Sequence, residues 1–145
     1  MAANKGRPAR MHTHAGHKSG GRLDGRAPAD LASAGHSIPF VIQFNYTGAT
    51  AEQPIYSADA PFAFTVIDVW CVATGGAGGA GDTALLDDGT TAITDAIDMN
   101  VADKIIARAA TIDDATASIA LNGSMDVTTA SSAVGTMYIL CVRTA

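Results

Sequence analysis

The sequence has few of the residues from which enzyme active sites and metal centres are usually built. Only 16% of its 145 residues are charged, against about a quarter in a typical domain. All four histidines lie at or before position 36, and no G-x-S-x-G motif occurs. Because a nucleophile or a general base needs such side chains in a folded frame, we expect that the chain is not an enzyme and holds no cofactor.

Long apolar runs and a cysteine framework are also missing. No stretch approaches the about 20 apolar residues of a membrane-spanning helix, and no apolar segment comes after the charged N-terminus as it would in a secretory signal. We therefore expect a protein made in the cytoplasm, with no membrane partner. Cys71 and Cys141 each lie in an apolar run, which favours two buried free thiols, although a disulfide between neighbouring strands stays open.

The charges that are present divide the chain in two. Residues 1–36 hold six cations and two acids, a net charge of +4, whereas residues 37–145 hold three cations and twelve acids, a net charge of −9. Residues 1–36 are rich in Gly and Ala and show no hydrophobic period, so we expect an extended basic N-terminal arm beside one folded domain, 37–145. A basic arm on an acidic body indicates a negative partner, either nucleic acid or the acidic face of a neighbouring copy. The candidate partner-binding residues of the arm are Lys5, Arg7, Arg10, His12, His14, His17, Lys18, Arg22 and Arg26.

The most informative stretch of the domain is 61–73, P-F-A-F-T-V-I-D-V-W-C-V-A. Strict alternation would put Phe62, Phe64, Val66, Trp70 and Val72 on one face, interrupted by Asp68, and Ala63, Thr65, Ile67, Val69 and Cys71 on the other. Both faces are mostly apolar, so one should pack in the core and the other against a neighbouring subunit. The stretch 136–143, T-M-Y-I-L-C-V-R, is similar. The candidate core or subunit-interface residues are Phe64, Val69, Trp70, Cys71, Tyr138 and Leu140.

Asp68 is the one charged residue on these two faces of 61–73. A carboxylate on a covered face needs a partner. Arg108 and Arg143 are the only arginines of the domain, so one of them is expected to pair with Asp68, either within the fold or across subunits.

The remaining segments predict further short strands. We expect them at about 39–47, 55–56, 83–86, 90–93 and 104–112, with one helical turn at 94–100. A hairpin with the three-residue loop 122–124 would pair Leu121 with Met125 and Ile119 with Val127. About eight short strands with Gly, Asp and Asn turns predict an all-β, antiparallel β-sandwich, jelly-roll-like, with the extended N-terminal arm.

Three local patterns suggest ligands but have simpler explanations. Residues 76–81 match G-x-G-x-x-G, yet the segment after them is too short for the helix that a dinucleotide site requires, which favours a permissive loop. The histidines lie on a glycine-rich segment rather than in a frame for zinc. The acid pairs 87–88 and 113–114 lack the spacing of a calcium loop. No metal site is expected.

The order of these parts resembles a known family. The segments F-T-V-I-D-V-W-C-V, A-L-L-D-D-G with I-T-D-A-I, K-I-I-A-R-A-A-T-I-D, I-A-L-N-G-S-M-D-V and Y-I-L-C-V-R are similar to the jelly-roll head decoration (cement) proteins of tailed bacteriophages. The resemblance implies a structural virion protein on the capsid exterior, a homotrimer that binds the major capsid protein and stabilises the shell without chemistry of its own.

Two other classes stay open on the sequence. One is another virion component, such as a minor tail, fibre or head-spike protein. The other is a free module that binds carbohydrate or nucleic acid. For carbohydrate we would expect several exposed aromatic residues, and the chain has only eight in all. Nucleic acid is disfavoured as a partner because the domain is strongly acidic.

Overall fold

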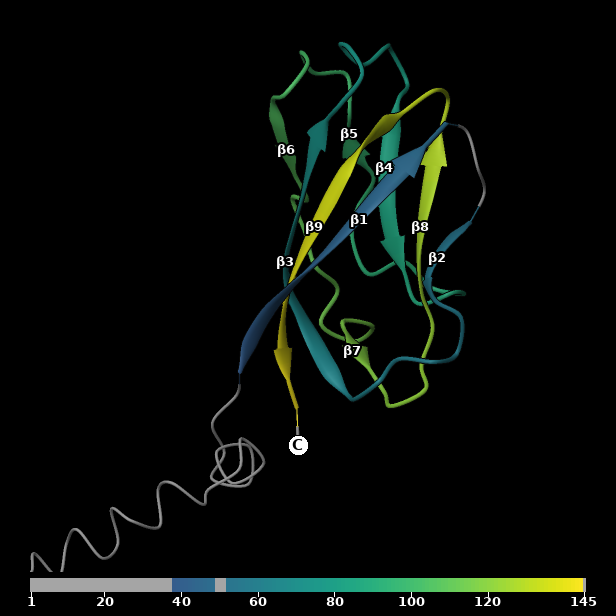
Figure 1. Ribbon diagram of the computed structural model, residues 1–145, viewed down its shortest axis with the longest axis vertical. Coiled ribbons are helices and arrows are strands. Elements are labelled where there is room, and N and C mark those ends of the chain that lie inside the picture. The colour runs from purple at the N-terminus through teal and green to yellow at the C-terminus, as the bar shows by residue number, and fades with distance from the viewer. Residues whose placement is uncertain (1–37, 49–51, 145) are drawn as a thin grey trace, which may run out of the picture. The chain divides into compact units, whose positions relative to one another are not determined.

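The computed structural model describes residues 38–48 and 52–144, which belong to one unit of the chain, Ser37–Ala145. The arm residues proposed to bind a partner lie outside the described residues. The sandwich is built from two sheets in which all neighbouring strands are antiparallel (Figure 1). Sheet A contains β1 (Pro39–Thr47), β9 (Val134–Arg143), β3 (Phe64–Ala73) and β6 (Ile106–Arg108) in that order, and β7 (Ser118–Ile119) also pairs with β3. Sheet B contains β2 (Gln53–Tyr56), β8 (Met125–Ala130), β4 (Thr83–Asp87) and β5 (Ile97–Asp98).

The strand order confirms the expected fold class. From β1 to β4, consecutive strands lie alternately in sheet A and sheet B. Near the end of the chain, β8 inserts between β2 and β4, and β9 inserts between β1 and β3. This interleaving is the double-sheet, jelly-roll-like arrangement. The core lies between the sheets, with Phe64, Val69 and Ile139 from sheet A opposed by Leu86 and Val127 from sheet B, all buried.

A β-bulge in β3 overturns the strict alternation expected for 61–73. Val66 and Asp68 pair with the consecutive residues Cys141 and Leu140, so Ile67 is one residue too many for the ladder. A bulge of this kind shifts the side-chain phase by one position. As a result Phe64 and Val66 share the core face with Val69, Cys71 and Ala73, whereas Trp70 and Val72 point away from the core.

Two further local expectations, for 94–100 and 90–93, were wrong in whole or in part. The segment 94–100 forms no helical turn; Ile97–Asp98 is strand β5, and burial of Ile97 and Met99 explains the extended backbone. Residues 90–93 do return antiparallel to β4, since Ala92 bridges Asp87 and the N–H of Ile93 bonds to the carbonyl of Leu86, but they form no strand. The Asp88 carboxylate instead accepts the N–H groups of Thr90 and Thr91 in a tight turn.

The strand expected at 104–112 is shortened to β6, Ile106–Arg108. Lys104 has a φ of 64°, the left-handed region, which ends extended structure at the start of the segment. At the other end, the Asp95 carboxylate accepts the N–H groups of Ala110 and Thr111 at 2.9 and 3.0 Å in place of a neighbouring strand. Backbone geometry at Lys104 therefore ends the strand at its start, and the Asp95 side chain ends it after Arg108.

The hairpin expected around 122–124 does not form, because its two arms belong to different sheets. Ile119 pairs with Phe64 in sheet A, whereas Met125 pairs with Tyr56 and Val127 with Leu86 in sheet B. Ile119, Met125 and Val127 still point into the core, whereas Leu121, expected on the same face, is 59% exposed. Alternation was therefore right for three of these four residues, but it could not identify the strand to which each arm bonds.

Candidate interaction face

The surface of sheet A that points away from the core is the candidate functional site. In an antiparallel sheet, register partners project to the same side. Gln43, Tyr138, Trp70 and Arg108 lie in one row across β1, β9, β3 and β6, and Asn45, Thr136, Val72 and Ile106 form the next row. We call this surface the outer face of sheet A; it also includes Val41, Leu140, Ile67 and Asp68.

An aromatic pair lies at the centre of this face. The rings of Trp70 and Tyr138 are stacked, with centroids 5.6 Å apart and planes 8° apart. The guanidinium carbon of Arg108 lies 5.5 Å from the centroid of the Trp70 ring, within the range of a cation–π contact. Because each ring is covered in part by its neighbours, these side chains are half-buried although they lie outside the core.

Asp68 has the partner that the sequence demanded. Nη1 of Arg108 donates to Oδ2 of Asp68 in a hydrogen-bonded ion pair. Arg143, the other candidate, instead lies over Phe62, with its guanidinium carbon 4.8 Å from the ring centroid. The Arg108 side chain is 62% exposed, so the pair contributes only about 0–1 kcal/mol to folding. Its more important effect is to neutralise both charges on the outer face.

Apolar side chains surround this neutral centre. Val41 and Ile67 are each 51% exposed and Ile106 is 58% exposed, which is high for large aliphatic residues within or beside a regular sheet. Leu140 and Val142 of β9 are half-buried on the same side. The outer face therefore presents aliphatic surface on both sides of the Trp70–Tyr138 stack.

Charge is distributed unevenly between the two sheets. Among strand residues, sheet A has one acid, Asp68, and two cations, Arg108 and Arg143, whereas sheet B has three acids and no cation. Those acids are Asp87, Asp98 and Asp126. The acidity of residues 37–145 is thus carried by sheet B and the loops, and not by the outer face of sheet A.

The six residues expected to form core or subunit interface separate into two groups. Phe64, Val69 and Cys71 are buried between the sheets, so within one chain they are core residues. Trp70, Tyr138 and Leu140 lie on the outer face and are half-buried. Three residues of this face, Val41, Ile67 and Ile106, were not predicted from the sequence. Alternation in β1 could have predicted that Val41 points away from the core. The exposure of Ile67 is explained only by the bulge.

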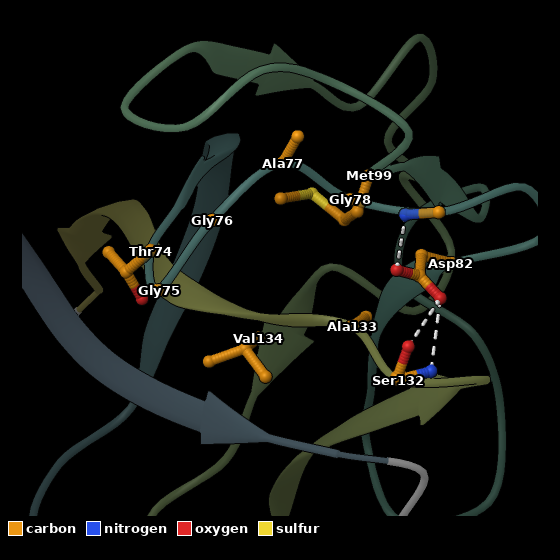
Figure 2. A pocket seen from close by; sticks show the side chains of 11 residues that line it. Thr74, Gly75, Gly76, Ala77, Gly78, Asp82, Met99, Ser132, Ala133 and Val134 are labelled. Carbon is orange, nitrogen blue, oxygen red and sulfur yellow. Dashed lines mark hydrogen bonds between the residues drawn. The ribbon is translucent and has the colours of Figure 1, made fainter.

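The glycine-rich stretch forms a loop over a pocket of about 260 Å³ (Figure 2). Strand β4 begins at Thr83, directly after the loop, so no helix N-terminus is present to meet a phosphate. The Asp82 carboxylate accepts N–H groups from Gly79 at 2.7 Å and Ser132 at 3.0 Å, and these bonds lower the pKa of Asp82. The carboxylate is thus engaged in closing the loop, which agrees with the expected permissive loop.

The two cysteines are free and buried, in agreement with the expectation of two separate thiols. Burial raises the pKa of each thiol to about 12. Thiolate is the nucleophilic form of cysteine. Neither Cys71 nor Cys141 therefore supplies a nucleophile near neutral pH.

Within residues 38–48 and 52–144, no group of three or more His, Cys, Asp or Glu side chains is arranged to hold a metal ion. Nor does the described part of the chain contain a helix long and apolar enough to cross a membrane. No protein-family model, curated protein or solved structure matches the chain. Function must therefore be inferred from the fold, the charge distribution and the outer face of sheet A.

Proposed function

We propose that this chain is a structural protein of a bacteriophage virion, which decorates and stabilises the capsid from outside by binding the major capsid protein shell. In this proposal it acts as a homotrimeric cement protein and catalyses no reaction. The resemblance in the order of its parts supports this, and so does the jelly-roll-like sandwich. The observation that carries the proposal is that β3 and β9 use apolar residues on both sides, for their own core and for the outer face of sheet A.

A sandwich needs only one apolar side of each sheet for folding. Apolar and aromatic residues on a second side are typical of a surface that another protein covers. A shell offers many equivalent positions, so each contact can be weak and still give stable attachment when it is repeated.

The basic segment 1–36 is the proposed attachment to the shell. Its net charge of +4 contrasts with the −9 of residues 37–145, so it suits an acidic surface on the capsid. Electrostatic attachment of this kind should weaken as salt rises, because exposed charges are screened beyond about 8 Å at physiological ionic strength.

Sedimentation of the native protein from its source through a sucrose gradient tests the proposal. We expect the chain to travel with a large particle in many copies. Migration as a free oligomer of a few chains would overturn the virion role, and one or a few copies per particle would favour a minor tail, fibre or head-spike component.

The attachment can be tested separately with two full-length variants. In the first, the six cations of residues 1–36 are replaced by glutamine, and we expect weaker binding to particles. In the control, the exposed residues Asp113 and Asp114 are replaced by asparagine, and binding should stay as in the wild type. Equal binding by the first variant would remove the arm from the mechanism.

The Trp70–Tyr138 stack favours one second candidate, a free carbohydrate-binding module. Sugar rings pack on aromatic faces, and this stack supplies aromatic surface on the outer face of sheet A. The stacking itself argues against this candidate, because one face of each ring is covered by the other ring and cannot contact a sugar. Quenching or a shift of Trp70 fluorescence on addition of a panel of polysaccharides would favour this candidate over the virion role.

A further inference from the structure

We propose that the outer face of sheet A is the surface through which one copy of this chain contacts a second copy. The inference rests on the proposed function, in which identical chains assemble. It goes further by assigning the contact to one face, with Trp70 and Tyr138 at its centre and Val41 and Ile106 on either side of them.

The first reason is the apolar surface itself. Val41 and Ile106 lie on the two outermost strands of the sheet A path, β1 and β6, and are 51% and 58% exposed. Between them lie the stacked rings of Trp70 and Tyr138. Aromatic residues surrounded by aliphatic ones are enriched at the centres of protein interfaces, because they bury much area with few rotamers to immobilise.

The second reason, which selects the occupant, is charge. Every copy has a net charge of −9 over residues 37–145, so two copies repel each other wherever their acidic surfaces meet. Among the strands, Asp68 is the only acid of sheet A, and Arg108 neutralises it. The outer face of sheet A is therefore where two acidic copies can approach with the least repulsion. A strongly basic partner would instead be attracted to sheet B.

The third reason is that the face carries one charge of each sign. It holds one guanidinium and one carboxylate, Arg108 and Asp68, side by side on β6 and β3. A second copy brings the same two groups, so each charge can meet its opposite across the contact while the aliphatic residues pack between them. Electrostatic complementarity of this kind fixes the register of a contact.

The test is the oligomeric state of the full chain, measured by sedimentation velocity over a range of concentrations. Val41→Asp and Ile106→Asp each place a carboxylate on the face at a position exposed enough to leave the core undisturbed. The matched control is Leu121→Asp, because Leu121 is 59% exposed and lies between β7 and β8, outside the sheet A strands. Circular dichroism of all four proteins verifies that the fold is retained.

We expect the wild type and Leu121→Asp to form the same oligomer, and each face variant to associate at least about a hundredfold more weakly, because a like charge opposite another in a contact costs several kcal/mol. The inference is overturned if the face variants keep the wild-type oligomer. It is also overturned if the wild type is monomeric and the face variants lose only their binding to particles, since the occupant is then the shell.

These outcomes separate the inference from the proposed function. If the face variants dissociate while the wild-type chain never sediments with particles, the contact between copies stands and the virion role fails. If the wild type decorates particles as an oligomer that the face variants do not disturb, the virion role stands and this assignment of the contact fails.

Discussion

Asp126 of β8 lies directly opposite Asp87 of β4 in sheet B. Both residues are buried, with Asp126 only 8% exposed and Asp87 only 7% exposed. The two carboxyl groups have different surroundings. Asp87 accepts the N–H of Gly89 and the hydroxyl of Thr128, both at 2.9 Å. Asp126 accepts no hydrogen bond from the described residues, and burial, followed by the charges of Asp87 and Glu52, raises its pKa. Sheet B therefore contains a strand pair that is destabilised while both carboxyl groups are ionised.

The first prediction is that Asp126→Asn stabilises the protein near neutral pH. The amide removes one charge of a like pair and leaves Asp87 with its two hydrogen bonds. Like charges directly opposite in a sheet are destabilising, and such pairs are worth about 0.5 kcal/mol. Chemical denaturation at pH 7 measures the gain. The control is Asp114→Asn, an exposed acid on a loop, which should leave the free energy of unfolding nearly unchanged.

The same pair gives a direction for the pH dependence. Because the pKa of Asp126 is raised on folding, the folded state binds its proton more tightly than the unfolded state does. The stabilisation from this group is complete below its unfolded pKa, and it is lost as pH rises through the folded pKa. A plot of unfolding free energy against pH for the wild type minus that for Asp126→Asn should therefore fall across this window. A flat difference would contradict the raised pKa.

Asp82 gives a prediction of opposite sign. Its pKa is lowered, first by the N–H of Gly79 and next by that of Ser132, so its contribution is present above the unfolded pKa and is lost as pH falls through the folded pKa. Asp82→Ala should lower the melting temperature at pH 7 and have less effect in acid. Asp82→Asn keeps an acceptor oxygen, so its melting temperature at pH 7 should lie between those of the wild type and Asp82→Ala. If the alanine variant melts like the wild type at pH 7, the carboxylate does not close the glycine loop.

Much of this fold could be predicted from the sequence because β3 and β9 leave little choice. Ten-residue runs that are apolar on both sides can form central strands and almost nothing else, and they lie in the middle of sheet A. The bulge at Ile67 could not be foreseen. Either phase of the strand places apolar residues on both faces, so hydrophobicity gave no preference between them.

The outer face was predictable in part, for a related reason. Alternation in β9 puts Tyr138 and Leu140 on one face, as observed. Strict alternation in β3 would put Trp70 on the same face as Phe64, and only the bulge separates the two. The pairing of Asp68 with Arg108 rather than Arg143 depends on which strand lies beside β3. Strand order depends on contacts between segments far apart in the sequence. For the same reason the sequence did not show that the chain passes from sheet A to sheet B at 120–124.

Gly78 gives a sharp packing prediction. A Cβ at this position would lie 1.8 Å from the carbonyl oxygen of Met99, a backbone atom that cannot move away alone. At the neighbouring Gly79 a Cβ would make only an ordinary contact, 3.6 Å from Oδ2 of Asp82. We expect Gly78→Ala to cost about 3 kcal/mol or more in the free energy of unfolding, and Gly79→Ala about 1 kcal/mol or less. Equal losses in the two variants would contradict the close approach of the loop to Met99.

The last prediction concerns the thiols. Cys71 and Cys141 are fully buried, and burial raises the pKa of each to about 12. A reagent that consumes thiolate should therefore find no reactive sulfur in the native protein at pH 8 and two after denaturation, because the ordinary thiol pKa of about 8.5 returns once the chain unfolds. The slow reaction of the native state should track the opening of the sandwich, so the logarithm of its rate should rise in Gly78→Ala in proportion to the stability that this variant loses. Rapid labelling of the folded wild type at one sulfur would show that β3 or β9 is not held in sheet A as described.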